Sequence, residues 1–123
     1  MKKQFLYILS CRDEPLIKVG LADSADKRFL ALERDRFDLR ESYMVQSTDE
    51  SWIRTLEQNL KTFFSAEQRV SDKPVINGNT ETFRSCALSK MIQMVEGFRT
   101  NFPCAEFGIR QDLSGVLPWA DEN

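Results

Sequence analysis

The pattern of hydrophobic and polar positions predicts a β-hairpin near the start of the chain. Apolar and aromatic residues fill 4–10 and then 16–20, and turn-forming residues at 13–15 separate the two runs. Two runs of strand length joined by a tight polar connection predict an antiparallel hairpin. A further run at 42–47 predicts a third strand.

Three other segments repeat their apolar residues with the 3.6-residue period of an amphipathic helix. The first begins near Ala25, after a capping Asp23 or Ser24, the second opens at Asp49, and the third is capped by Ser85. Their apolar stripes are Ala25, Phe29 and Leu32, then Ile53, Leu56, Leu60, Phe63 and Phe64, and finally Leu88, Met91, Ile92, Val95 and Phe98. A brief extended piece is expected at 81–83.

These elements follow one another in the order β-β-α-β-α-(β)-α. That order predicts an α+β domain in which a small three-stranded antiparallel sheet is flanked by helices. We expect the domain to occupy residues 1–100. Residues 101–123 contain two prolines and two glycines without clear periodicity, and we expect them to form an extension that packs on the domain or meets a protein partner.

The amino-acid composition of the chain limits the kinds of site that it can form. The chain has 123 residues, enough for one domain, with a mean hydropathy of −0.42 and a net charge of −2. No apolar run approaches the ~20 residues that cross a bilayer, so we expect a cytoplasmic protein with no membrane association. Three widely spaced cysteines and the absence of histidine argue against a zinc site or a disulfide framework. Any acid–base chemistry must therefore come from Tyr, Lys, Asp or Glu.

Two short motifs and the residues that follow them resemble the GIY-YIG nuclease superfamily. Residues 5–9 (Phe-Leu-Tyr-Ile-Leu) and 17–20 (Ile-Lys-Val-Gly) resemble its two motif strands, in the branch common in phages and mobile elements where the second motif reads K-[IV]-G. Arg28 falls where the family has its helix arginine. Segments 56–64 and 79–83 resemble the family's later helix and its glutamate-aromatic-Phe segment.

The resemblance implies a divalent-metal-dependent DNA endonuclease with Tyr7, Lys18, Arg28 and Glu81 in its active site. These residue types suit phosphodiester hydrolysis, which needs an activated water and charge stabilisation at the phosphate. Glu81 would hold one Mg²⁺ or Mn²⁺ ion, and Arg28 would grip the phosphate in a bidentate manner. Tyr7 and Lys18 lie on adjacent predicted strands; Lys18 would orient or deprotonate the water, and Tyr7 would relay a proton.

Further residues are expected to support this site or to hold DNA. Glu57 and Asn79 are expected to assist the active-site residues without binding the metal. The candidates for phosphate contacts are Arg34, Arg36, Arg40, Arg54, Lys61 and Arg84. One active site per chain predicts that a monomer nicks one strand, and a homodimer or two successive events would be needed for a double-strand break. The family branch implies attack on competing DNA, in conflicts that involve phages or mobile elements.

The chain departs from the family pattern, and each site residue also has an ordinary structural explanation. Lys18 replaces the second tyrosine, Lys61 replaces a helix histidine, and Phe5 replaces the first glycine. Tyr7 could pack against a helix, Lys18 could be a solvated strand residue, and Glu81 could charge the start of the third helix. Only the joint arrangement of these residues favours a catalytic site.

Two other functions remain open. A DNA-binding module that kept the fold and lost turnover is favoured by the missing histidine and the low net charge. Binding without cleavage in Mg²⁺ or Mn²⁺ would identify it. A protein-interaction or inhibitor domain would act through the acidic extension, where an exposed Trp119, Phe102 or Phe107 would suit an interface.

Overall fold

The strand β1 (Gln4–Cys11) lies at the centre of the structure, a computed structural model that describes residues 3–22, 36–70 and 82–114. It pairs antiparallel with β2 (Leu16–Ala22) on one side and with β3 (Phe37–Ser47) on the other. Residues 5–9 of β1 are all buried. An unbroken buried run of this length is typical of a strand that is covered on both faces.

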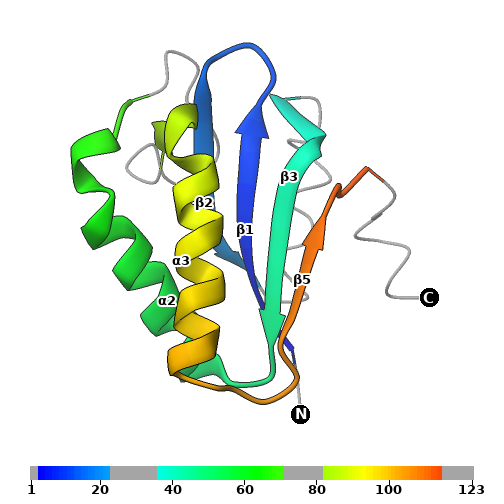
Figure 1. Ribbon diagram of the computed structural model, residues 1–123. Helices are drawn as coiled ribbons and strands as arrows, with labels where there is room; N and C mark the ends of the chain where they lie inside the picture. The colour runs from blue at the N-terminus through cyan, green and yellow to red at the C-terminus, as the bar shows by residue number, and fades with distance from the viewer. Residues whose placement is uncertain (1–2, 23–35, 71–81, 115–123) are drawn as a thin grey trace.

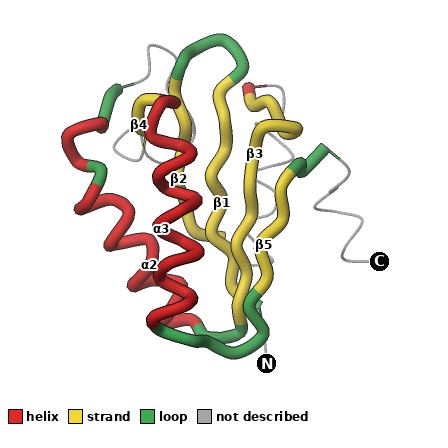
Figure 2. The backbone as a smooth tube through the Cα atoms, in the orientation of Figure 1, coloured by secondary structure: helices red, strands yellow, loops and turns green. Residues whose placement is uncertain are grey.

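Two short strands extend the sheet at its edges. β4 (Thr82–Arg84) pairs with β2, and β5 (Gly108–Gln111) pairs with β3. The sheet therefore has the order β4-β2-β1-β3-β5, and every neighbouring pair is antiparallel (Figure 2).

Two helices, α2 (Glu50–Phe63) and α3 (Leu88–Asn101), lie side by side on one face of this sheet (Figure 1). Asp49 begins α2, because its carboxylate accepts a hydrogen bond from the backbone N–H of Trp52 at 3.1 Å. The buried residues of both helices form one core with the strand residues that face them, Leu6, Ile8, Ile17, Val19 and Val45.

The other face of the sheet carries a second apolar cluster. Its buried members are Phe5, Tyr7, Leu9, Phe37, Leu39, Met44 and Leu113. Leu113 belongs to this cluster although it follows β5: its side chain is fully buried, and its N–H donates to the carbonyl of Leu39 at 2.7 Å. The chain beyond α3 therefore supplies both an edge strand and a core residue.

The α+β class is confirmed, whereas the predicted three-stranded sheet is wrong, because the sheet has five strands. The hairpin and the two later helices are confirmed as β1–β2, α2 and α3, and the predicted extended piece corresponds to β4 at 82–84. Ser85 does not cap α3 as predicted, because it opens the short turn at 85–87 that precedes the helix. β4 and β5 have three and four residues, too few to show a period. The helix predicted near Ala25 lies outside the described residues, so the complete order of elements is not established.

β3 begins five residues earlier than the predicted start at residue 42. Phe37 and Leu39 are buried and alternate with Asp38 and Arg40, as a strand requires. The register of β1 against β3 shifts between Asp38 and Tyr43. This irregularity breaks the alternation before Met44, as a β-bulge does. Among the described residues, no helix is long and apolar enough to span a membrane.

Leu113→Ala is expected to lower the free energy of unfolding by about 2–5 kcal/mol, because it empties a fully buried position. Urea denaturation measures the loss. Ile109→Ala, in β5 itself, is the control: Ile109 is 36% exposed, so its truncation should cost about 1 kcal/mol or less. Equal losses in the two variants would show that Leu113 is not a core residue.

Candidate active site

Tyr7 and Lys18 share the face of the sheet that lies opposite α2 and α3. The hairpin register pairs Leu9 with Lys18 and Tyr7 with Gly20. Antiparallel partners project to the same face, and side chains alternate along a strand, so Tyr7, Leu9 and Lys18 all project to this side, here called the Tyr7 face. Tyr7 and Lys18 are diagonal neighbours, a relation that sets side chains about 7–8 Å apart.

Lys18 is buried, with only 3% of its surface exposed. Its neighbours across the sheet are Leu9 on β1 and Thr82 on β4. The explanation of Lys18 as a solvated strand residue is therefore wrong. Lysine is rarely buried, because removing an ammonium group from water is unfavourable unless its charge is compensated. A buried lysine is also one whose chemistry its surroundings can tune, which makes the position a candidate for function.

Tyr7 is also buried, at 5% exposed, and belongs to the apolar cluster of its face. Its register partners are Gly20 on β2 and Met44 on β3, and its ring lies 6.3 Å from the ring of Phe5. A glycine opposite an aromatic residue leaves room for the ring over the neighbouring strand. Packing therefore explains the ring of Tyr7, and any chemical role must come from its hydroxyl group.

Charged groups gather around Cys11 at the turn end of the sheet, the end at which β1 turns into β2. Burial raises the pKa of the Cys11 thiol, and the negative charge of Glu14 raises it further. The positive charges of Arg36 and Lys18 lower that pKa and offset part of the rise. The N–H of Arg12 donates to the carbonyl of Arg36 at 2.9 Å. The structure thus brings Arg36, a predicted phosphate contact, to the same end as Lys18.

β4 lies next to Lys18 and begins one residue after Glu81. Thr82 is the register partner of Lys18, and Glu81 precedes Thr82 in the sequence. Glu81 itself lies outside the described residues, and so do three other predicted site residues, Arg28, Arg34 and Asn79. Within the described ranges, no group of three or more His, Cys, Asp or Glu side chains could hold a metal ion. The structure therefore relates Tyr7 to Lys18 but gives no geometry for the predicted metal ligand.

Three predicted site residues lie on α2, behind the sheet. Glu57 forms an ion pair with Lys61 at 3.4 Å, and Arg54 pairs with Glu50 at 2.9 Å. Because α2 packs on the face opposite the Tyr7 face, these side chains are not brought together with Lys18. Helical spacing predicts that Glu57 and Lys61 are neighbours, but it does not say which face of the sheet the helix covers.

Arg40 and Arg84 are the remaining predicted phosphate contacts. Arg40 is exposed on β3, where its backbone N–H donates to the carboxylate of Asp38 at 3.2 Å. Arg84 on β4 is the register partner of Leu16 on β2. Leu16 lies two residues along β2 from Lys18. Side-chain alternation therefore sets Arg84 on the Tyr7 face.

Arg69 is a candidate site residue that the sequence does not predict. Its N–H donates to the carbonyl of Thr82 at 2.9 Å, so Arg69 lies on the far side of β4 from Lys18. No sequence signal marks this position, because Arg69 falls in a polar stretch without periodicity, and the contact joins residues that are 13 positions apart.

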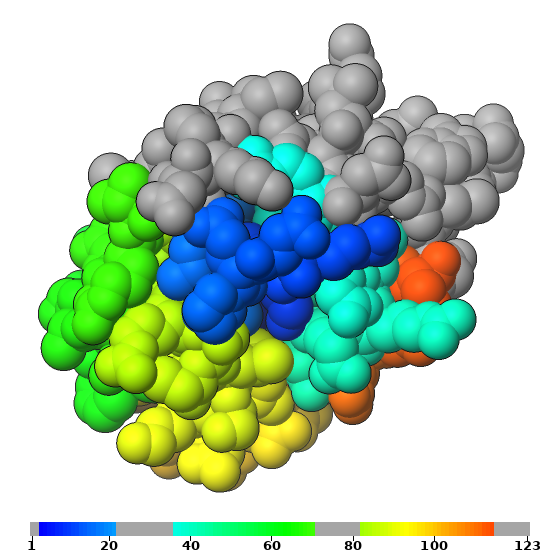
Figure 3. Space-filling view, turned by 90° about the horizontal axis from the view of Figure 1, so that it is seen from above, coloured from blue at the N-terminus to red at the C-terminus, as the bar shows by residue number. Residues whose placement is uncertain are grey.

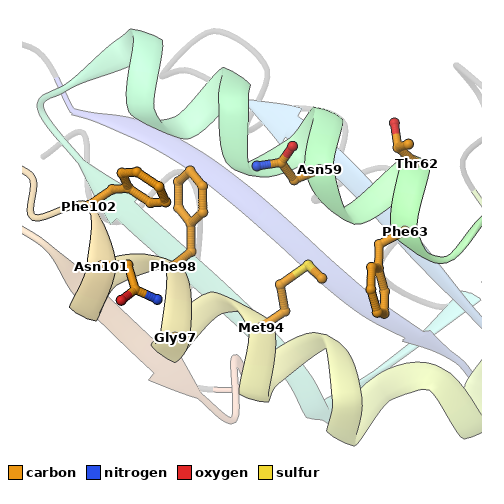
Figure 4. Close-up of a pocket in the computed structure, with 8 residues that line it drawn as sticks. All are labelled: Asn59, Thr62, Phe63, Met94, Gly97, Phe98, Asn101 and Phe102. Carbon is orange, nitrogen blue, oxygen red and sulfur yellow. The ribbon is translucent and has the colours of Figure 1, made fainter.

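A hollow of about 450 Å³ lies between α2 and α3 (Figure 4). Its lining consists mainly of aromatic and methionine side chains, and two asparagine side chains add amide groups. The residues of these kinds are Phe63, Met94, Phe98, Phe102, Asn59 and Asn101. None of the eight residues drawn in Figure 4 is charged. The hollow therefore offers no charged group to a phosphate or a metal, unlike the Tyr7 face.

No family of known proteins, no curated protein and no solved structure matches the chain. The interpretation of the Tyr7 face therefore rests on its own geometry and chemistry.

Lys18→Met is expected to raise the pKa of the Cys11 thiol further, because it removes a positive charge that favours the thiolate. Glu14→Gln is expected to lower that pKa, since it removes a negative charge. The pH dependence of iodoacetamide alkylation, resolved by peptide mapping, measures both shifts. The exposed Cys86 should react alike in all proteins. If the pH dependence of Cys11 alkylation is unchanged in both variants, the charges of Lys18 and Glu14 do not influence the pKa of Cys11.

Proposed function

We propose that this protein is a divalent-metal-dependent DNA endonuclease of the GIY-YIG kind. The observation that carries the proposal is the register of the β1–β2 hairpin, which sets Tyr7 of one motif and Lys18 of the other on one face. β4 then sets Thr82, the residue after Glu81, beside Lys18. Three motif segments that are separate in the sequence thereby meet on three neighbouring strands.

In this proposal the side chains act together on one phosphodiester. Arg28 holds the scissile phosphate through its planar guanidinium group. Lys18 orients the attacking water or accepts its proton, and the hydroxyl of Tyr7 relays a proton.

Glu81 would supply the ligand for one Mg²⁺ or Mn²⁺ ion. A carboxylate oxygen is a donor that these ions prefer, and such an ion would stabilise the charge that develops on the phosphate. A single carboxylate is a sparse set of ligands, and the described residues add no acidic cluster. Metal affinity is therefore expected to depend on the phosphate oxygens of bound DNA.

One such site per chain would cut one strand, so the expected product of a monomer is a nick. A homodimer would be needed to cut both strands in one event. The resemblance to phage and mobile-element nucleases supports competing DNA as the target.

A second candidate function, a DNA-binding module that does not cut, is favoured by the burial of the site. Tyr7 is 5% exposed and Lys18 is 3% exposed, which leaves little surface for a water molecule and a phosphate. DNA binding that persists while no strand is cut in Mg²⁺ or Mn²⁺ would identify this function.

Supercoiled plasmid is expected to be nicked by the wild-type protein in Mg²⁺ or Mn²⁺ and to stay intact without metal. Glu81→Ala and Arg28→Ala should each slow nicking by about 100-fold or more, as expected for groups that stabilise the transition state. Arg99→Ala is the matched control, because Arg99 is exposed in the last turn of α3, behind the sheet, and it should nick at the wild-type rate.

The outcomes separate the candidate functions. Binding without cleavage in either metal would favour the binding module. Nicking that survives both Glu81→Ala and Arg28→Ala would mean that the chemistry takes place elsewhere in the protein.

A further inference from the structure

A basic hollow lies at the turn end of the sheet, where β4 leads into α3. Its volume is about 310 Å³, and its lining residues are Pro15, Leu16, Arg69, Arg84, Ser85 and Cys86. The N–H of Ser85 donates to the carbonyl of Pro15 at 2.9 Å, which joins the β1–β2 turn to η4 (Ser85–Ala87), the short turn before α3. Figure 3 looks onto this end, where the blue atoms of the β1–β2 turn lie against the yellow-green atoms at the start of α3.

The backbone of Arg69 is fixed beside β4. Its N–H donates to the carbonyl of Thr82 at 2.9 Å, and the Thr82 hydroxyl donates back to the carbonyl of Arg69. Nη1 of Arg69 donates to the carbonyls of Gln68 at 2.7 Å and Ala66 at 3.2 Å. These bonds restrict the side chain, so less conformational entropy is lost when it binds a ligand. Nε and Nη2 carry further N–H donors that suit an anion.

Arg84 approaches the same hollow from β4. Its Nη1 lies 3.6 Å from Oε2 of Glu67, and the two side chains are 53% and 34% exposed. That separation exceeds the ~2.7–2.9 Å of a charge-assisted hydrogen bond, and an exposed ion pair of this kind is weak. A backbone phosphodiester carries the same single negative charge as a carboxylate, and its oxygens suit the fork of a guanidinium group, so it can displace Glu67 from Arg84.

The short turn η4 lines the hollow through Ser85 and Cys86, and α3 begins beyond them at Leu88. The N–H of Ser85 already donates to Pro15. Neither η4 nor α3 has an acidic residue in its first turn, so neither adds a negative charge that would repel an anion there. The hydroxyl of Ser85 adds a donor to the lining.

We propose that Arg69, Arg84 and Ser85 form a phosphate-binding pocket, and that its ligand is a phosphate group of a nucleic-acid backbone. Arg84 lies two residues along β4 from Thr82, the partner of Lys18, a separation of roughly 7 Å at about 3.3 Å per residue. A strand that places one phosphate at Lys18 would therefore present a neighbouring phosphate to the pocket. DNA as the carrier of that phosphate rests on the proposed nuclease function, whereas phosphate binding itself does not.

Fluorescence anisotropy of a labelled DNA duplex, measured without divalent metal so that no strand is cut, tests the backbone as ligand. Arg69→Gln and Arg84→Gln should each weaken binding about tenfold, since each removes a charged hydrogen bond, and should reduce the salt slope by about 1. Arg99→Gln loses the same charge in the last turn of α3, on an exposed side chain, and should change neither quantity. Glu67→Gln should tighten binding, because it removes the carboxylate that pairs with Arg84.

Inorganic phosphate, titrated into ¹⁵N-labelled protein, tests the pocket without DNA. The backbone amide signals of residues 85–87 should shift in the wild type and stay in place in the double variant Arg69→Gln, Arg84→Gln. Chloride at equal ionic strength is the control for nonspecific salt effects. Thermal unfolding of each variant verifies that it is folded.

Each outcome bears on a different part of the proposal. Loss of DNA affinity and of the phosphate response in the arginine variants supports it. A phosphate response with unchanged DNA affinity supports the pocket and overturns the backbone as its ligand. No phosphate response, with losses of DNA affinity no larger than that of Arg99→Gln, overturns the pocket. Wild-type protein that binds DNA through Arg69 and Arg84 but never cuts plasmid leaves the pocket standing and refutes the nuclease.

Discussion

The register of β1 against β2 is the constraint on which the rest of the structure depends. Because β1 is buried on both faces, its side chains divide by strict alternation between the helix-covered core and the Tyr7 face. A slip of one residue would turn Leu6 and Ile8 away from α2 and bring Tyr7 under the helices, so the whole core would be lost. The position of Tyr7 relative to Lys18 is therefore a consequence of the apolar packing beneath α2 and α3.

Apolar packing does not account for the burial of Lys18 on the Tyr7 face. An ammonium group taken out of water destabilises a fold unless its charge is compensated, and an apolar side chain of similar length carries no such penalty. Lys18 nevertheless lies between Leu9 and Thr82 in the sheet, a position that packing alone does not explain. A buried ionisable side chain that packing does not require is a candidate for function. The turn end also holds Arg36, whose charge acts on Cys11 together with that of Lys18, and Arg69 and Arg84 around one hollow.

The sequence predicts the central elements well, because their periods are determined locally. The stripe Ile53, Leu56, Leu60 identifies α2, and a period of two sets Tyr7 and Lys18 on a shared hairpin face. The sequence does not predict the edge strand β5, because its four residues show no period and pair only where β3 offers an edge. It predicts the extended piece at β4 but not the pairing of that piece with β2. Helical spacing likewise identifies Glu57 and Lys61 as neighbours but not the side of the sheet on which they lie. The contact between Arg69 and Thr82 depends on a reversal of the chain that no local pattern predicts.

The central claim is that Tyr7 and Lys18 act together on one phosphate, and a double-mutant cycle on metal-dependent plasmid nicking tests it most directly. The cycle compares Tyr7→Phe, Lys18→Met and the double variant, each first shown by thermal unfolding to be folded. The account predicts that each single variant loses about 100-fold and that the double variant loses little more than the worse single one, because groups that serve one step are non-additive. Losses that multiply, or single variants that nick as fast as the wild type, would contradict it.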